Sequence, residues 1–307
     1  MSGHHHDHGA DAGDKRIWWA ILVNVLLTFA QIAGGVVSGS LSLLADALHN
    51  FSDAASLVIA YGARRISRRP ADDTMTFGYV RAEIVAALIN YTTLIVIGLY
   101  LLYEAVMRFI TPEPIEGWIV VIVASIALAI DVVTAMLTYA LSKSSMNIRA
   151  AFLHNVADAL GSVGVIIAGT VVLIYGWIWI DPAITLLIAG YILWQAFTEI
   201  GSSIRLLMMA TPEDVDAVQV VLDLRSVEGV QDVHHVHVWA LDEGHNAFEA
   251  HLVVADDSFI EVAKVKRRVR KILREKHGIA HSTLEIETPG DRCDNGSKVI
   301  GHEVDKL

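Results

Sequence analysis

Hydrophobic residues are distributed very unevenly along this chain. Between residues 17 and 208, long stretches contain almost no charged side chain, whereas both ends of the chain are rich in charge. About 20 consecutive apolar residues are enough for a helix to cross the hydrocarbon core of a membrane. We therefore expect six membrane-spanning helices, at about 17–38, 41–63, 82–108, 116–141, 149–175 and 180–206.

The connections between these helices predict their orientation. The first, third and fifth connections carry no Lys or Arg apart from Arg108 at the edge of the third. Loops on the cytoplasmic side of a membrane are enriched in Lys and Arg, so both termini are expected in the cytoplasm, as an even number of spans requires. The basic residues on that side are Lys15, Arg16, Arg64, Arg65, Arg68, Arg69, Arg81, Lys143 and Arg149.

The pattern changes after residue 208. Thr211-Pro212-Glu213-Asp214 is typical of a helix start, with a Thr cap, Pro at the first position and acids in the first turn. Within residues 230–240, His235, His237 and Trp239 alternate with Val236 and Val238, as expected for a half-buried strand. We expect a helix, two strands, a helix and a strand, in a ferredoxin-like order. Their approximate ranges are 212–225, 230–240, 247–255, 258–277 and 282–287.

The predicted organisation is thus a His-containing cytoplasmic tail (1–16), a six-helix transmembrane domain (17–208), an α+β ferredoxin-like cytoplasmic domain (209–290) and a flexible tail (291–307). Composition agrees, because 54% of the residues are hydrophobic and only 19% are charged, which is unusual for a soluble protein. The first apolar run is too long for a cleaved signal peptide and is expected to remain as a span.

Charge and cysteine content exclude some functions. The net charge is -11, and acids outnumber bases in 209–307, so nucleic acid is not expected as a partner. The chain has one cysteine, which rules out an internal disulfide. We expect Cys293 to be an inert thiol in the tail, with a redox or metal role as the alternative. His4, His5, His6 and His8 form either a weak metal-collecting tail or a dispensable one.

A short motif occurs twice inside the apolar half. It reads Leu48-His49-Asn50-x-x-Asp53 in the second span and Leu153-His154-Asn155-x-x-Asp158 in the fifth. A His and an Asp four residues apart lie on one helix face, about one turn from each other. Two such helices side by side would present two imidazoles and two carboxylates, a tetrahedral set suited to a divalent metal such as zinc.

Ionisable groups at membrane depth are costly and usually serve a pathway or a bound ion. A ligand His must be neutral and a ligand Asp ionised, so metal and protons compete for the same site. This competition favours metal/proton exchange over static binding. Asp46 is expected either to support a ligand His or to pair helices, and Asp131 is a further candidate either to carry a proton or to support a ligand. Asn24, Gln31, Asn90 and Glu104 are expected to join helices or to lie at the membrane interface.

Several motifs together resemble the cation diffusion facilitator family of divalent-metal exporters over most of residues 15–290. These motifs are the paired HxxxD, the loop Arg69-Pro70-Ala71-Asp72-Asp73 with Phe77-Gly78-Tyr79-Val80-Arg81-Ala82-Glu83, His234-x-x-His237-Val238-Trp239, and His281-Ser282-Thr283-Leu284-Glu285-Ile286-Glu287.

The resemblance implies a homodimer in the cytoplasmic membrane that exports zinc, and also cadmium, in exchange for protons. It implies a transport site of His49, Asp53, His154 and Asp158. In the cytoplasmic domain it implies metal ligands at His234, His251 and Glu287, with His281 in a motif common among zinc transporters.

Two departures from the family pattern affect other sites. Met75 and Tyr79 stand where some members have histidines beside Asp72, so a metal site in that loop is not expected. Lys264 stands where some members have a bridging histidine, so a single weaker site or a differently built one is expected in the cytoplasmic domain rather than a full two-metal cluster. Alternatives to a zinc exporter are an exporter that prefers cobalt or nickel, an intramembrane metalloenzyme and a membrane-bound metal sensor. A metalloenzyme needs an open coordination position, and the sequence contains no HExxH.

Overall fold

The computed structural model describes residues 25–142, 146–242, 244–255, 258–293 and 299–301, with side chains left out at 57, 137–138 and 140–154. Contacts divide the chain into two compact units. One unit ends at Gly62 and resumes over Ala86–Ile200, and the other comprises Ala63–Val85 and the chain from Gly201 onward.

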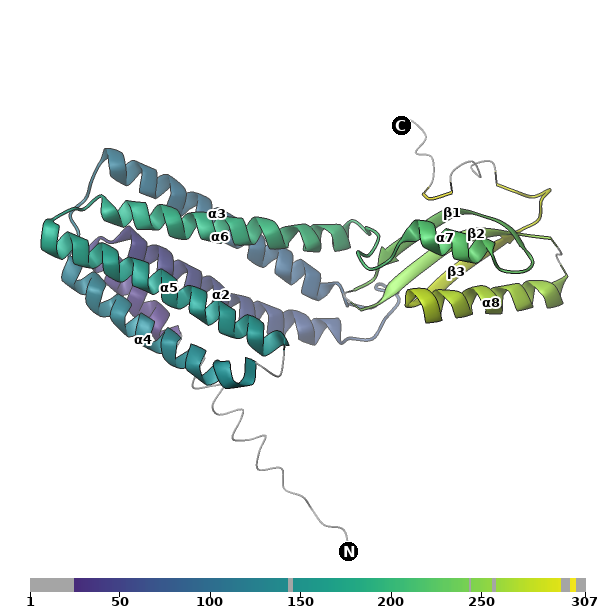
Figure 1. Cartoon of the computed structure of the whole chain (residues 1–307), viewed down its shortest axis with the longest axis horizontal. Helices are drawn as coiled ribbons and strands as arrows, with labels where there is room; N and C mark the ends of the chain where they lie inside the picture. The colour runs from purple at the N-terminus through teal and green to yellow at the C-terminus, as the bar shows by residue number, and fades with distance from the viewer. Residues whose placement is uncertain (1–24, 143–145, 243, 256–257, 294–298, 302–307) are drawn as a thin grey trace, which may run out of the picture. The chain divides into compact units, whose positions relative to one another are not determined.

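The first unit is a bundle of long helices (Figure 1). After the helix Val25–Ser38 come α2 (Leu41–Ser67), α3 (Ala82–Ile110), α4 (Gly117–Ser142), α5 (Met146–Tyr175) and α6 (Ile180–Leu207). Within the described residues, stretches of α3, α4, α5 and α6 are long and apolar enough to cross a membrane. Less than a third of each such stretch is buried in the bundle, which leaves apolar faces for lipid.

Helix α2 is the central element of this unit. It was expected to be a span like the others, but it is less apolar than α3 to α6 because it carries Asp46, Asp53, Arg64 and Arg65. One of its faces packs with α3 and α6, and another packs with α4 and α5. The buried residues of these two clusters are Leu41, Ala45, Leu94, Leu101, Ala105, Ala189, Ile192 and Ala196, and then Leu43, Val120, Ala124 and Val165.

A buried carboxylate fixes the start of α2. Asp181, at the start of α6, accepts hydrogen bonds from the backbone N–H groups of Leu41 at 2.7 Å and Ser42 at 3.2 Å. The hydroxyls of Ser40 and Ser42 also donate to Asp181. The first N–H groups of a helix have no partner within the helix, and a negative charge there is favourable. Asp181 therefore ties the two helices together.

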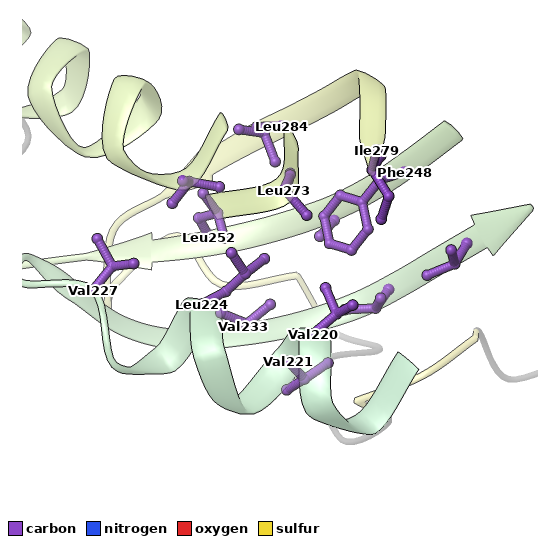
Figure 2. Packing of buried hydrophobic residues seen from close by; sticks show 14 of the residues in the cluster. Val220, Val221, Leu224, Val227, Val233, Phe248, Leu252, Leu273, Ile279 and Leu284 are labelled. Atoms are coloured by element: carbon purple, nitrogen blue, oxygen red, sulfur yellow. The ribbon is translucent and has the colours of Figure 1, made fainter. Parts of the chain in front are cut away.

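The second unit contains α7 (Ala217–Arg225), β1 (Val230–Ala240), β2 (Asn246–Val254), α8 (Phe259–His277) and β3 (Ile279–Glu287). Strands β1 and β2 are antiparallel, and β2 and β3 are parallel, in the order β1-β2-β3. Residues of both helices and of the sheet form one apolar core (Figure 2). The predicted order of elements is therefore confirmed, as is the fold class of membrane helices followed by an α+β domain.

One local prediction for this unit needs correction. Helix α7 begins at Ala217 rather than beside Thr211, because the Asp216 side chain accepts from the N–H groups of Val218 and Gln219. Most of the tail predicted to be flexible (291–307) lies outside the described residues, so its flexibility stays a prediction. In its described parts, Arg292 donates to Asp232, and residues 299–301 pair with β1 at Val236.

Candidate metal sites

The motif residues whose side chains are described meet between α2 and α5. Nε2 of His49 lies 3.7 Å from Oδ2 of Asp53 and 3.5 Å from Oδ1 of Asp158. Zinc binds His and carboxylate ligands at about 2.0–2.2 Å, which places two ligand atoms of a tetrahedron about 3.3–3.6 Å apart. The spacing therefore fits a metal ion with little rearrangement. We call His49, Asp53 and Asp158 the membrane cluster.

Its fourth predicted member is His154. It lies on α5 one turn before Asp158, but its side chain is outside the described part of the structure. The backbone spacing is the same as that between His49 and Asp53, so a helical α5 places His154 and Asp158 on one face.

Polar side chains next to the membrane cluster form a buried network. Gln31 donates to Asp46 at 2.7 Å, and the Ser162 hydroxyl lies 3.3 Å from Asp46 and 3.2 Å from Asp131. A hydroxyl has one hydrogen, so Ser162 can donate to only one of these carboxyl groups at a time. Asp46 thus pairs helices, and the bridge through Ser162 was not predicted from the sequence.

Two further contacts near the membrane cluster bear on the residues predicted there: one between aromatic rings and one hydrogen bond. Tyr191 of α6 lies with its ring edge-on to His49, at 6.4 Å between centroids, and was not predicted as part of this region. Asn90 accepts a hydrogen bond from Ser56, which agrees with its expected role of joining helices.

A second group of ligand atoms lies in the cytoplasmic domain. The strand register places His234 on β1 directly opposite His251 on β2. Glu285 on β3 lies opposite His251, and Glu287 is two residues further on the same face. His251 Nδ1 is 2.6 Å from Oε1 of Glu287, and His234 Nε2 is 3.2 Å from Oε2 of Glu287.

The sequence missed one member of this group. Sγ of Cys293 lies 3.3 Å from Nε2 of His234. Ligand atoms of His234, His251, Glu287 and Cys293 all lie within 4.8 Å of one another, and we call these four residues the cytoplasmic cluster. The sequence predicted an inert thiol at Cys293, with a redox or metal role as the alternative, and nothing in it indicates that the chain turns back toward β1 after β3.

A bulge in β1 lies next to the cytoplasmic cluster. The pairing of β1 with β2 shifts between His234 and His237, and His235 has a φ of 54°, which is uncommon for a residue other than Gly. Val233 and His234 lie before this shift, in regular register with β2, and both are fully buried. Burial lowers the pKa of His234 despite the nearby Glu287. The imidazole is therefore neutral at pH 7, as a metal ligand must be.

The remaining candidates lie elsewhere. His281 on β3 faces the ring of Phe77, with centroids 6.1 Å apart, and is outside the cytoplasmic cluster. Lys264 on α8 pairs with Glu261 at 2.6 Å. Asp72 organises the loop between α2 and α3: it accepts from Thr74, Met75 and Tyr79, which hold its pKa well below the usual range.

Comparison with known proteins assigns both units. Residues 17–208 match the cation efflux transmembrane domain, and residues 212–289 match the cytoplasmic domain of cation efflux proteins. A cadmium, cobalt and zinc/H(+)-K(+) antiporter of Bacillus velezensis is 35% identical over 95% of this chain and 94% of its own length. Zinc transporter ZitB of Escherichia coli is 32% identical over 97% of this chain and 98% of its own length.

A solved structure, the metal-bound C-terminal domain of the CzcD transporter from Cupriavidus metallidurans, is 29% identical. It covers 24% of this chain and 99% of that chain, with a TM-score of 0.22. Together, the two domain matches and the full-length relatives show that this chain belongs to the cation efflux family, the cation diffusion facilitators, as a multi-pass membrane transporter with a cytoplasmic C-terminal domain.

Proposed function

We propose that this protein exports zinc, and also cadmium, from the cytoplasm in exchange for protons. The observation that carries the proposal is the membrane cluster, in which two helices bring an imidazole and two carboxylates within ligand distance of one point. His49, Asp53 and Asp158, with His154 as the fourth ligand, would hold the transported ion. The relatives' names, which include zinc, cadmium and cobalt, support a divalent cargo.

Proton exchange follows from the chemistry of these ligands. The ion binds when His49 is neutral and Asp53 and Asp158 are ionised. A low proton concentration in the cytoplasm therefore favours loading, and a higher one on the other face favours release. A site that opens to one face at a time converts this competition into antiport.

The setting of the transporter is part of the proposal. We place both termini in the cytoplasm, since the basic connections lie on that side. The protein would work as a homodimer in the cytoplasmic membrane, in accord with its match to the cytoplasmic domain of cation efflux proteins. His234, His251 and Glu287 would bind a second, non-transported ion in that domain.

The test is metal flux in proteoliposomes with an imposed pH gradient. We expect gradient-driven zinc uptake by the parent protein, and loss of at least nine-tenths of it in His49→Ala and in Asp158→Ala. His245→Ala is the matched control, because this exposed histidine pairs only with Asp242 among the described contacts. Parent-like flux in His49→Ala would refute the proposed site, and replacing zinc with cadmium, cobalt or nickel defines the cargo.

A further inference from the structure

Cys293 lies among the ligand atoms of the cytoplasmic domain rather than apart from them. Its Sγ is 3.3 Å from Nε2 of His234, and His234 is fully buried. In a tetrahedral zinc site, with Zn–S of about 2.3 Å and Zn–N of about 2.0–2.1 Å, these two atoms would be about 3.5–3.6 Å apart. The observed separation is close to that value.

Contacts on both sides of Cys293 hold the chain against β1. The turn after β3 is closed by the N–H of Asp291, which donates to the carbonyl of Thr288. Arg292 then donates to Asp232 of β1 at 2.7 Å. Further along, Gly301 donates to the carbonyl of Val236 at 2.9 Å. The thiol thus reaches His234 from a segment that is anchored before and after it.

The surroundings of the thiol are those of a cation site. Glu287 is 4% exposed, and its Oε2 has no hydrogen-bond donor among the described residues, although it lies 3.2 Å from Nε2 of His234. A buried carboxylate oxygen without a donor is costly. The other carboxylate oxygen of Glu287 lies 2.6 Å from Nδ1 of His251, so the carboxylate lies between the two imidazoles that would share the ion with it.

We propose that Cys293 is the fourth ligand of a closed metal site, completed by His234, His251 and Glu287, for a thiophilic divalent cation such as zinc or cadmium. The proposal rests on the second, non-transported ion proposed above and adds its coordination chemistry. Four protein ligands leave no open position, as in structural sites. A thiolate also favours zinc and cadmium over oxygen-preferring ions such as magnesium and manganese.

The test uses the full-length protein with Co(II) as a spectroscopic probe. Thiolate bound to Co(II) gives a charge-transfer band in the near ultraviolet, and Cys293 is the chain's only cysteine, so a band reports on this residue alone. We expect the band at one Co(II) per chain in the parent and in His49→Ala. It should be absent in Cys293→Ser and in His234→Ala, and unchanged in the control His281→Ala.

Alkylation gives an independent measurement. Zinc should slow the reaction of Cys293 with iodoacetamide at least ten-fold in the parent, and by less than two-fold in His234→Ala. The proposal is overturned if the parent binds cobalt without the band, if the band persists in His234→Ala, or if zinc leaves alkylation unchanged. Flux measured on the same samples keeps the two proposals separate, because His49→Ala should abolish transport while retaining the band.

Discussion

Removing the Asp181 carboxylate should loosen the helical unit at the start of α2. Asp181 is 1% exposed and accepts from two backbone N–H groups, those of Leu41 and Ser42. Hydrogen bonds to a charged acceptor contribute about 1.5–3 kcal/mol each, so Asp181→Ala should cost about 3–6 kcal/mol. Asp181→Asn keeps one acceptor oxygen and should lose about half of that. The Ser40 and Ser42 hydroxyls already lie 3.2 Å apart and can bond to each other.

The assay is thermal unfolding of the purified protein, read beside zinc flux. A loss of 3 kcal/mol corresponds to a fall in Tm of about 6–12 °C for a unit of this size. Flux should fall as well, because His49 lies about two helical turns beyond Leu41 on the same helix. The exposed Asp73 provides the control, since Asp73→Ala should leave Tm within about 1 °C. An Asp181→Ala protein that melts within 2 °C of the parent would refute this account of the α2 cap.

Three further changes test the packing and charge of the two units. Leu224→Ala should destabilise the cytoplasmic domain by about 2–5 kcal/mol, measured by urea unfolding, because this side chain is fully buried; a loss under 1 kcal/mol would contradict its place in the core. Gly169→Ala should lower Tm, since an added Cβ would lie 2.9 Å from Cγ1 of Val120 and force α4 from α5; an unchanged Tm would show that the helices adjust freely. Lys276 lowers the pKa of Asp223, so this carboxylate stabilises the fold above its unfolded pKa near 4 and the contribution is lost as pH falls through the lower folded pKa. Asp223→Asn should therefore lower Tm at pH 7, whereas in acid the Tm of the variant should approach that of the parent. A Tm difference of the same size at both pH values would argue against the pairing of Asp223 with Lys276.

Much of the fold could be predicted from short-range patterns. Apolar runs predicted the helices because their length is set by the membrane, and the spacing of His49 and Asp53 predicted ligands on one face because a helix turns every 3.6 residues. The order of elements in the cytoplasmic domain followed from periodicity in the same way. These inferences need only neighbouring residues.

Contacts between distant segments could not be predicted. The α2 cap depends on Asp181, which is far away in sequence. The position of Cys293 depends on a turn after β3 and on the pairing of Arg292 with Asp232. None of these has a signal in a single sequence, because each depends on how separate elements pack.

The division of the membrane cluster between α2 and α5 has a consequence for the empty transporter. Ligand atoms of Asp53 and Asp158 come from different helices yet lie within 4.8 Å of each other. In the proposed transport site, a bound cation would offset the two negative charges and hold the helices together. Without the cation, the same charges would repel, since like charges at this distance in a poorly solvated setting are unfavourable. Protons that neutralised them would let the helices close again, so the proton would serve as the counter-ion of the return step as well as its driving force.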